Sequence, residues 1–564
     1  MFFSWRFHVV IAILVLVFCA LAARMIYLTI FDRSFLEHQS DVRTLRTINM
    51  PAFRGMILSA DNVPLAMSIP VDEVSINPQD FPATNEQVSK LASLLGFSTG
   101  KLWEILQQNH NRFFVYLKRD LNAETGDKIQ ALHIRGVYLD RQYHRYYPQG
   151  AITSHIVGFT NIDDQGQEGL ELAYNSWLQG TAGKQQVLKD RLGHIVAQVR
   201  TVSEAKPGNN LALSINSRIQ FLAYHVLKET VDQYQAVAGT VIVMNPKTGE
   251  ILALVNQPDF DPNLPHKSPY DRYRNRAVTD TYEPGSTLKV FSMANGLESG
   301  RYAPDTQIDT SPGWFMIGRN EVRDEHNNGV LTLTQILAKS SNVGVAKMTL
   351  SLGGPDHLLG VLRRAGFGQL TQSGFPGENA GILPNYAKWP VFDIATLAFG
   401  YGITVTPIQL VQAYSAIAND GRVCPVSIFK LQTTPTCQQV FTPKTADTLL
   451  HMMQAVLAPG GTATEAVVPG YQVAGKTGTA GIAGANGYHS NNYVSTFIGI
   501  APVSHPRLLI LVMIRKPQSI FHGGGFIAAP AFSKIMAGAL RILNVPPDAV
   551  EVAMPTATPF PESN

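Results

Sequence analysis

The most informative stretch of this chain is EPGSTLK, residues 283–289, which predicts a turn followed by a helix that carries a serine and a lysine. A Pro-Gly pair makes a sharp turn, and the residues after it continue at helical spacing. We therefore expect Ser286 at the start of a helix, among free backbone N–H groups at the positive end of the helix dipole. Lys289 follows three residues later, on the same face and within reach of the serine.

A serine and a lysine at this spacing suit nucleophilic catalysis. A serine is a weak nucleophile until a base takes its proton, and a lysine can be that base when burial or a neighbouring cation lowers its pKa. The pair alone is weak evidence, because an N-cap serine with a chance lysine is the commoner explanation of S-x-x-K. Three other matches to this pattern begin at Ser98, Ser203 and Ser427.

Two further motifs follow Ser286 in order along the chain. Ser340-Ser341-Asn342 comes after a predicted helix at 331–338, and Lys476-Thr477-Gly478-Thr479 comes after strand-like residues 471–475. The ordered set S-x-x-K, S-x-N, K-T-G is typical of penicillin-recognising serine acyltransferases. Order and context separate it from chance matches, which lie at Ser75–Asn77, Ser214–Asn216 and Lys247–Gly249.

The second motif suits proton transfer and substrate binding. Ser340 would shuttle a proton between Lys289, Lys476 and the leaving group, and Asn342 would donate to a substrate amide carbonyl. Polar residues at such a helix junction are more often caps or turns, so this assignment depends on the complete ordered set.

The third motif predicts a strand edge that binds substrate. Lys476 can attract a carboxylate, and the hydroxyls of Thr477 and Thr479 can hydrogen-bond it. Gly478 permits close approach of a substrate backbone that adds as an extra strand. The main-chain N–H groups of Ser286 and Thr479 would together form an oxyanion hole. The simpler interpretation is a loop lysine at a strand end.

The N-terminal region has the composition of a membrane anchor. Val9–Ala23 is an unbroken apolar run that Arg24 interrupts and Met25–Phe31 extends. Because an arginine near a helix end can reach the interface, the whole stretch approaches the roughly 20 residues that cross a bilayer. A cleaved signal peptide is the alternative, since Ala20-Leu21-Ala22 is similar to a cleavage site. No second long apolar run occurs, so we expect the remaining chain on one side of the membrane.

Composition and pattern predict a folded α+β protein. The 564 residues are 45% apolar and 15% charged, with a formal net charge of +3. These values fit roughly three or four units with a large core and give no reason to expect nucleic acid. With only three cysteines we expect neither a zinc knuckle nor a disulfide scaffold, and no metal or cofactor. Helical patterns at 217–235 and 528–543, with β-rich runs between them, predict helices on an antiparallel sheet. The β-rich runs are 239–244, 251–255, 493–500 and 507–514.

The expected organisation has four parts. They are a cytoplasmic tip with a membrane anchor, a mixed region of short strands and loops with little helix, a catalytic domain, and a flexible tail. The breaker cluster KPGNN at 206–210 marks the main joint, and the Pro-rich end at 556–564 is typical of disorder. The four parts are residues 1–31, 32–210, 211–545 and 546–564.

With these motifs in place, the chain resembles the class B penicillin-binding proteins of the cell-division, FtsI-like type over nearly its whole length. One departure is LSADNV at 58–63, where the family usually has a charged turn. The form SSNVG at 340–344 favours the division type over the elongation type. The other segments that carry the resemblance are 54–55, 145–148, 166–171, 275–286, 399–402, 405–407 and 522–524.

The resemblance implies an elongated pedestal, or dimerisation-like, domain and a serine β-lactamase-like transpeptidase domain whose antiparallel sheet carries helices on both faces. It implies a peptidoglycan D,D-transpeptidase of septal wall synthesis. Ser286 would attack the D-Ala-D-Ala carbonyl of a stem peptide, D-Ala would leave, and an amine of a neighbouring stem would resolve the acyl-enzyme. β-Lactam antibiotics would acylate the same serine. The family carries no glycosyltransferase domain, so an FtsW-like membrane glycosyltransferase and other division proteins are the implied partners.

A periplasmic catalytic domain on a single-pass inner-membrane anchor would lie in an oxidising compartment. Cys424 and Cys437 open the β-rich runs 423–431 and 437–441, with a turn at 433–435 between them. A hairpin there would bring the two Cβ atoms to roughly 4 Å, as a disulfide requires. A disulfide between these cysteines is therefore one expectation, and two independent thiols are the other.

Two other interpretations share part of the signature. A β-lactamase, a D,D-carboxypeptidase or a β-lactam sensor has the same three motifs. The long N-terminal region argues against the first two, and the single anchor argues against a multi-pass sensor. A non-catalytic scaffold of the division machinery would keep the fold, but the intact Ser286, Lys289 and Lys476 argue against it.

Overall fold

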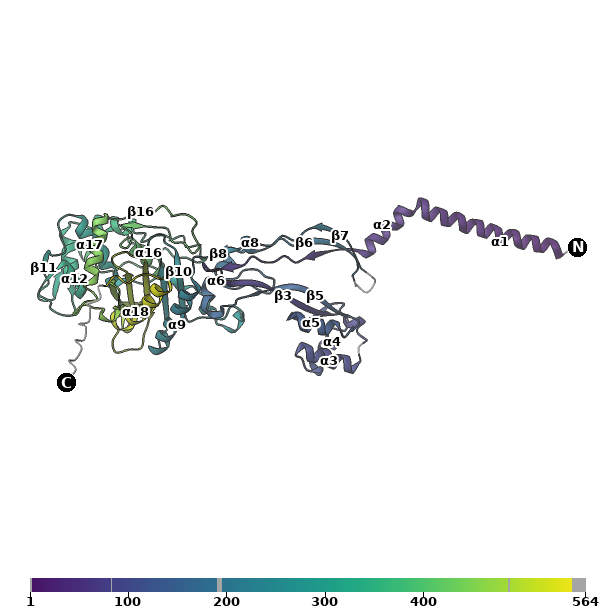
Figure 1. Ribbon diagram of the computed structural model, residues 1–564, viewed down its shortest axis with the longest axis horizontal. Coiled ribbons are helices and arrows are strands. Elements are labelled where there is room, and N and C mark those ends of the chain that lie inside the picture. The colour runs from purple at the N-terminus through teal and green to yellow at the C-terminus, as the bar shows by residue number, and fades with distance from the viewer. Residues whose placement is uncertain (1–2, 83, 190–194, 485–486, 550–564) are drawn as a thin grey trace, which may run out of the picture. The chain divides into compact units, whose positions relative to one another are not determined.

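The computed structural model describes residues 3–82, 84–189, 195–484 and 487–549, so the Pro-rich end at 556–564 lies outside the described residues. The chain divides into two compact units, whose elements Figure 1 labels in chain order. Unit 1 comprises Met1–Gly55, Pro70–Tyr143 and Gln179–Asn209, and unit 2 comprises Met56–Ile69, His144–Leu178 and Asn210–Asn564.

Unit 1 begins with an apolar helix. Helix α1 (Phe3–Ile26) continues as a π-helical turn, Tyr27–Phe31. The stretch Trp5–Phe31 has a mean hydropathy of 2.9 with none of its window buried, which is consistent with a single membrane anchor. One other described helix, α18 (Gly524–Ile542), is long and apolar enough to span a bilayer. Because 56% of its window is buried, α18 is better explained as a core helix of unit 2.

The prediction of little helix after the anchor is wrong for part of unit 1. Helix α3 (Asn85–Leu95) begins at a capping box formed by Thr84 and Gln87 and buries an apolar face. Helix α4 (Thr99–Gln108) begins where the hydroxyl of Ser98 accepts from the backbone N–H of Lys101, so this match to S-x-x-K is an N-cap. The other elements of unit 1 are α2 (Arg33–Thr44), α5 (Ala123–Gln130), β4 (Val115–Leu121) and the antiparallel strands β1 (Leu45–Met50), β6 (Gly183–Lys189) and β7 (Ile195–Ser203). Two strands, β3 (Pro64–Ile76) and β5 (Val137–Tyr146), run through both units.

Unit 2 is built on a five-stranded antiparallel sheet in the order β10-β9-β19-β18-β17. Helix α9 (Ser217–Gln233) and helix α18 lie side by side over one face (Figure 1). On β18, Phe497 packs against Phe532 of α18, with ring centroids 4.7 Å apart. The neighbouring Thr496 points to the opposite face, toward the Ser286 turn. The strands are β9 (Ala238–Met244), β10 (Ile251–Gln257), β17 (Ala474–Gly484), β18 (Gly487–Ala501) and β19 (Leu508–Arg515).

Helices therefore cover both faces of this sheet, and the predicted α+β class is confirmed. The second face carries the helical part of unit 2, whose central helix α11 (Lys289–Glu298) is buried over most of its length. The third motif lies inside the edge strand β17 rather than after a separate short strand. The other longer elements are α12 (Leu333–Lys339), α13 (Asn342–Ser351), α14 (Asp356–Arg364), α15 (Val391–Leu397), α16 (Pro407–Ser415), α17 (Pro443–Gln454) and the hairpin β12 (Trp314–Ile317) with β13 (Asn320–Arg323). The short elements are β2 (Ile57–Leu58), α6 (Ser154–Val157), α7 (Gly169–Ala173), α8 (Asn175–Leu178), β8 (Leu211–Ala212), α10 (Arg276–Thr279), β11 (Gln307–Asp309) and β14 (Val330–Thr332).

The structure accounts for two local sequence patterns in unit 2. The K-T-G match at 247–249 is a hairpin turn, in which the N–H of Gly249 donates to the carbonyl of Asn245 over 2.9 Å. Cys424 and Cys437 form a disulfide. The extent of the hairpin beside them differs from the prediction, because only β15 (Arg422–Val423) and β16 (Gln438–Gln439) pair.

Candidate active site

Ser286 lies in a short 3-10 turn, Gly285–Leu288, directly before α11. Gly285 has a φ of 53°, and a Cβ there would lie 3.2 Å from the carbonyl oxygen of Thr479. A residue without a side chain can hold this left-handed conformation so close to β17. The N–H of Gly285 donates to the carbonyl of Gly400 over 3.1 Å. The serine turn is thus fixed between the edge strand and the loop at Gly400.

Lys289 is fully buried and its amine points at Ser340. It donates to the hydroxyl of Ser340 over 3.1 Å and also to the carbonyl of Ser340. No hydrogen bond joins the hydroxyl of Ser286 to Lys289 among the contacts of the described residues. The lysine that sequence spacing places beside the nucleophile is therefore held by the second motif.

Ser340 occupies the turn between α12 and α13 in a left-handed conformation, with a φ of 58°. Such a conformation is strained for a residue with a side chain, and here it presents both oxygens of Ser340 to Lys289. The amine of Lys476 reaches the same hydroxyl over 3.2 Å. The Ser340 hydroxyl thus joins the two lysines, one from α11 and one from β17.

Burial shifts the protonation of both lysines, which have no exposed surface. It lowers the pKa of Lys289 to about 7, although the negative charges of Asp324 and Glu325 oppose the shift. Burial lowers the pKa of Lys476 well below its ordinary value, and the nearby charge of Lys289 adds to the effect. A buried amine without a carboxylate partner favours its neutral form, so a proton acceptor is available at neutral pH.

The remaining residues of the third motif lie along β17. The hydroxyl of Thr477 is 3.2 Å from the amine of Lys476 and 2.9 Å from the hydroxyl of Thr462. The hydroxyl of Thr479 accepts from the N–H of Gly524 over 3.3 Å. A Cβ at Gly478 would lie 2.8 Å from a methyl of Thr287, so a glycine is what allows β17 to approach the serine turn.

Asn342, the last residue of the second motif, opens α13. Its side-chain amide donates to the carbonyl of Arg323 over 2.9 Å, so it is held by the end of β13. The structure brings the second motif and Lys289 and Lys476 together by hydrogen bonds, and it places Ser286, Gly478 and Thr479 beside them through the close approach of the turn to β17.

Sequence reasoning missed the polar residues that hold this arrangement. The hydroxyl of Tyr414 donates to the carbonyl of Thr287 over 2.6 Å, which fixes the serine turn from α16. The buried Asp324 accepts from the start of α13. No spacing rule connects these positions with the motifs that they contact: Tyr414 lies 127 residues from Thr287, and Asp324 lies 17 residues before Ser341. In the described part of the chain no group of three or more His, Cys, Asp or Glu side chains could hold a metal ion.

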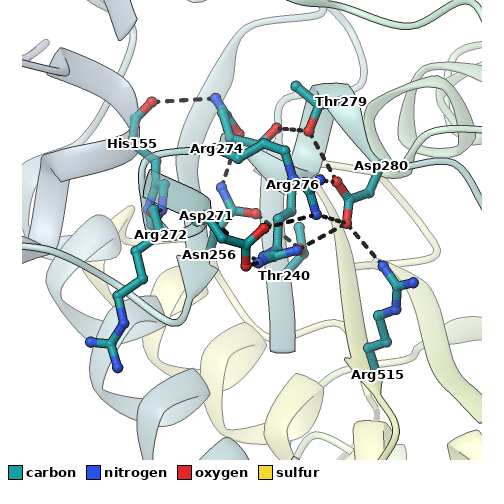
Figure 2. A network of polar contacts seen from close by, with 11 residues as sticks. His155, Thr240, Asn256, Asp271, Arg272, Arg274, Arg276, Thr279, Asp280 and Arg515 are labelled. Atoms are coloured by element: carbon teal, nitrogen blue, oxygen red, sulfur yellow. Dashed lines mark hydrogen bonds and ion pairs between the residues drawn. The ribbon is translucent and has the colours of Figure 1, made fainter. Parts of the chain in front are cut away.

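A cluster of arginines secures the segment that leads into the nucleophile. Figure 2 shows three guanidinium groups around the carboxylate of Asp280, which lies six residues before Ser286. The nitrogen–oxygen distances to Asp280 are 3.1 Å from Arg274, 3.2 Å from Arg276 and 3.0 Å from Arg515. Because Arg515 ends β19, this cluster ties the approach to Ser286 to the central sheet.

Comparison with known proteins agrees with this geometry. Residues 239–537 match the penicillin-binding protein transpeptidase domain and residues 49–213 match the penicillin-binding protein dimerisation domain. The "Probable peptidoglycan D,D-transpeptidase PbpC" of Pseudomonas aeruginosa is 40% identical over 545 residues, covering 97% of this chain and 96% of that protein. Peptidoglycan D,D-transpeptidase FtsI of Escherichia coli is 36% identical over 554 residues, covering 97% and 94%. The crystal structure of penicillin-binding protein 3 from Mycobacterium tuberculosis, complexed with aztreonam, superposes with a TM-score of 0.69 at 28% identity, covering 89% of this chain and 98% of that one.

The fold and the three converging motifs define a serine acyltransferase of the penicillin-binding type. The chain belongs to the class B penicillin-binding proteins, as an FtsI-like peptidoglycan D,D-transpeptidase. Such an enzyme cross-links peptidoglycan stem peptides through an acyl-enzyme during cell division.

The arginine cluster yields a stability prediction. Asp280→Asn removes the carboxylate that three guanidinium groups share. Asp271 remains paired with Arg274 and Arg276, of which Arg276 is 8% exposed. Because this leaves a buried cation with less compensation, we expect a loss of about 3 kcal/mol in the free energy of unfolding. Chemical denaturation of the detergent-solubilised chain measures it. Glu229→Gln, which breaks the exposed pair with Lys534, should cost less than about 1 kcal/mol. Equal effects of the two substitutions would mean that the cluster has no special role.

Proposed function

We propose that Ser286 is the nucleophile of this transpeptidase and that Lys289 is the base that activates it. The observation that carries the proposal is the meeting of two fully buried lysines at the hydroxyl of Ser340, beside the Ser286 turn. A neutral lysine at this position can accept the proton of the serine when substrate binds.

The reaction then proceeds in two halves. The oxygen of Ser286 attacks the penultimate D-Ala carbonyl carbon while its proton passes to Lys289. The tetrahedral intermediate collapses, the carbon–nitrogen bond breaks, and D-Ala leaves with a proton that Ser340 relays. In the second half a neighbouring stem amine attacks the ester, loses a proton by the same path, and displaces Ser286. A β-lactam passes through the first half only. Its amide nitrogen is the leaving group, and this nitrogen remains part of the acyl group on Ser286 after the ring opens.

The edge of β17 supplies the binding groups in this proposal. A stem peptide would add to Thr477–Thr479 as an extra strand, with its carbonyl oxygen between the N–H groups of Ser286 and Thr479. A substrate carboxylate beside Lys476 would raise the pKa of that lysine. Lys476 would therefore become protonated, and so positively charged, when substrate binds. Asn342 would donate to a substrate amide carbonyl from the other side.

Ser286→Ala should abolish covalent labelling by a fluorescent penicillin while leaving the thermal unfolding of the chain unchanged. The matched control is Ser98→Ala, because Ser98 also begins an S-x-x-K pattern but caps α4 in unit 1. That variant should label like the unsubstituted chain. Persistent labelling of Ser286→Ala would place the acylation site elsewhere.

The two lysines should not be interchangeable. Lys289→Arg should stop acylation, since an arginine cannot lose its proton at working pH. Lys476→Arg should retain part of the acylation rate, because a cation at that position can still attract a carboxylate. Lys101→Arg serves as the control, because Lys101 is the lysine of the S-x-x-K pattern in which Ser98 only caps α4. Stopped-flow acylation by a chromogenic β-lactam gives the rates, and equal losses in the first two variants would contradict the division of roles.

We also propose an orientation and a partner. The apolar stretch Trp5–Phe31 would cross the inner membrane once, with the residues after Phe31 in the periplasm. The two matched domains are a dimerisation and a transpeptidase domain, so glycan polymerisation would come from an FtsW-like membrane glycosyltransferase. The disulfide between Cys424 and Cys437 supports an oxidising compartment.

The anchor proposal predicts the fate of the N-terminus. The mature chain should fractionate with membranes and keep its apolar stretch, and protease added to spheroplasts should digest the residues after Phe31. N-terminal sequencing and protease protection measure these two properties. A mature chain that begins near Ala23 would mean a cleaved signal peptide. If the residues after Phe31 were fully protected from the protease, they would lie on the cytoplasmic side instead.

A further inference from the structure

A pocket of about 320 Å³ lies in unit 2, where segments of the two matched domains meet. One wall comes from residues 154–169, which belong to the matched dimerisation domain. The other walls come from residues 270–279 and 375–377 of the matched transpeptidase domain. No described residue that lines the pocket belongs to the three motifs. The pocket is therefore separate from the acylation site, and its volume is at the small end of the range of small-molecule sites.

Glu168 is an acid without a partner in the lining of this pocket. It is half-buried at the start of α7, and its carboxylate makes no hydrogen bond or ion pair with a described residue. Burial raises the pKa of Glu168, and no neighbouring charge or donor offsets this effect. A Cβ at Gly158 would lie 1.8 Å from the carbonyl oxygen of Glu168, so close packing fixes the backbone there. A half-buried carboxylate of this kind gains a charge-assisted hydrogen bond when a cationic donor enters the pocket.

The other charged groups and the histidine in the lining are paired or neutral. Arg274 pairs with Asp280 over 3.1 Å and with Asp271, a second acid of the pocket, over 3.6 Å (Figure 2). His155 is buried, and desolvation lowers its pKa to about 4, so this imidazole carries no positive charge at neutral pH. Among the described residues that line the pocket, only Glu168 has a charge without a partner. The pocket therefore favours a cationic ligand.

Aromatic side chains line the same pocket. The rings of Tyr270 and Tyr273 lie 5.9 Å apart in an edge-to-face arrangement. The hydroxyl of Tyr273 donates to the carbonyl of Ser268 over 2.9 Å, which fixes this ring. Phe375 is 6% exposed and adds apolar surface. The faces of tyrosine rings attract cations, and apolar surface stabilises a methylene chain. A carboxylate and aromatic rings in one pocket therefore suit an alkylammonium group.

We propose that this pocket binds an aliphatic primary ammonium group, with Glu168 accepting its hydrogen bonds and the rings of Tyr270 and Tyr273 contacting its positive charge. A peptidoglycan stem with a free side-chain amine carries this group, and so does a free diamine. The site goes beyond the proposed function, because no step of the acyl transfer uses it.

The test is a titration of the detergent-solubilised full chain with pentylamine at about pH 8, followed by saturation-transfer nuclear magnetic resonance of the ligand. Pentylamine is an ammonium ion at this pH, because an alkyl amine like that of lysine has a pKa of about 10.4. We expect a dissociation constant on the order of 1 mM, since the ligand has few atoms. Pentan-1-ol, which has the same chain length and no charge, should bind at least about 10-fold more weakly. Pentanoate, which is an anion, should not bind.

Substitutions assign the binding to this pocket. Glu168→Gln should weaken pentylamine binding about 10-fold or more, because it removes the charge of the acceptor. Tyr270→Ala should weaken it about 2- to 5-fold through the loss of one ring. Because Tyr270 is 80% exposed, this second variant changes the pocket without a substitution in the core. Glu229→Gln is the matched control, since it makes the same change in an exposed pair with Lys534, and it should bind pentylamine like the unsubstituted chain.

Equal binding of pentylamine to Glu168→Gln and to the unsubstituted chain would overturn the proposal, and so would equal affinities for pentylamine and pentan-1-ol. If Glu168→Gln does not fold, unchanged binding to Tyr270→Ala would overturn it instead. Two further probes, the stem tripeptide L-Ala-γ-D-Glu-meso-diaminopimelate and 1,5-diaminopentane, identify the source of the amine by which of them binds more tightly. Ser286→Ala should bind pentylamine like the unsubstituted chain, so the result for this pocket is independent of the nucleophile.

Discussion

The burial of two lysines against one serine hydroxyl is the interaction on which the rest of the structure depends. Lys289 and Lys476 lose all contact with water and share the hydroxyl of Ser340. Lowering the pKa of Lys289 from 10.5 to about 7 corresponds to roughly 5 kcal/mol in favour of the neutral amine. The fold therefore keeps a base available at neutral pH, because burial disfavours the charged form of both lysines.

Such a site requires support from several elements that are distant in sequence. The serine turn is fixed by Gly400 and by Tyr414 of α16, and its approach is tied to β19 through the carboxylate of Asp280. The second motif is held by Asp324. Each contact restricts the conformations of an irregular or strained turn. The rigid elements that make these contacts thereby hold the catalytic groups in position.

The sequence predicts this molecule well where the signal is local or recognisable. The order of the three motifs and the α+β class follow from residue type and spacing, whereas the sequence left the disulfide and two independent thiols as open alternatives. The helices of unit 1 were missed although α3 has a clear capping box at Thr84 and buried residues at helical spacing, because short helices between loops give weak periodicity. Asp324 and Asp280 were missed for a different reason: their meaning arises only from tertiary contacts. The sequence did predict Ser340 between Lys289 and Lys476, and the structure adds that the Lys289 amine donates to the Ser340 hydroxyl over 3.1 Å.

The protonation state of Lys289 tests this account most directly. Nuclear magnetic resonance of the chain with lysine labelled by ¹³C at the ε position follows each amine through a pH titration, and comparison with Lys289→Arg assigns the resonance. The account predicts a midpoint near pH 7 for Lys289. A midpoint near the ordinary lysine value of about 10.4 would contradict it, because Lys289 would then be protonated at neutral pH and could not accept the proton of Ser286.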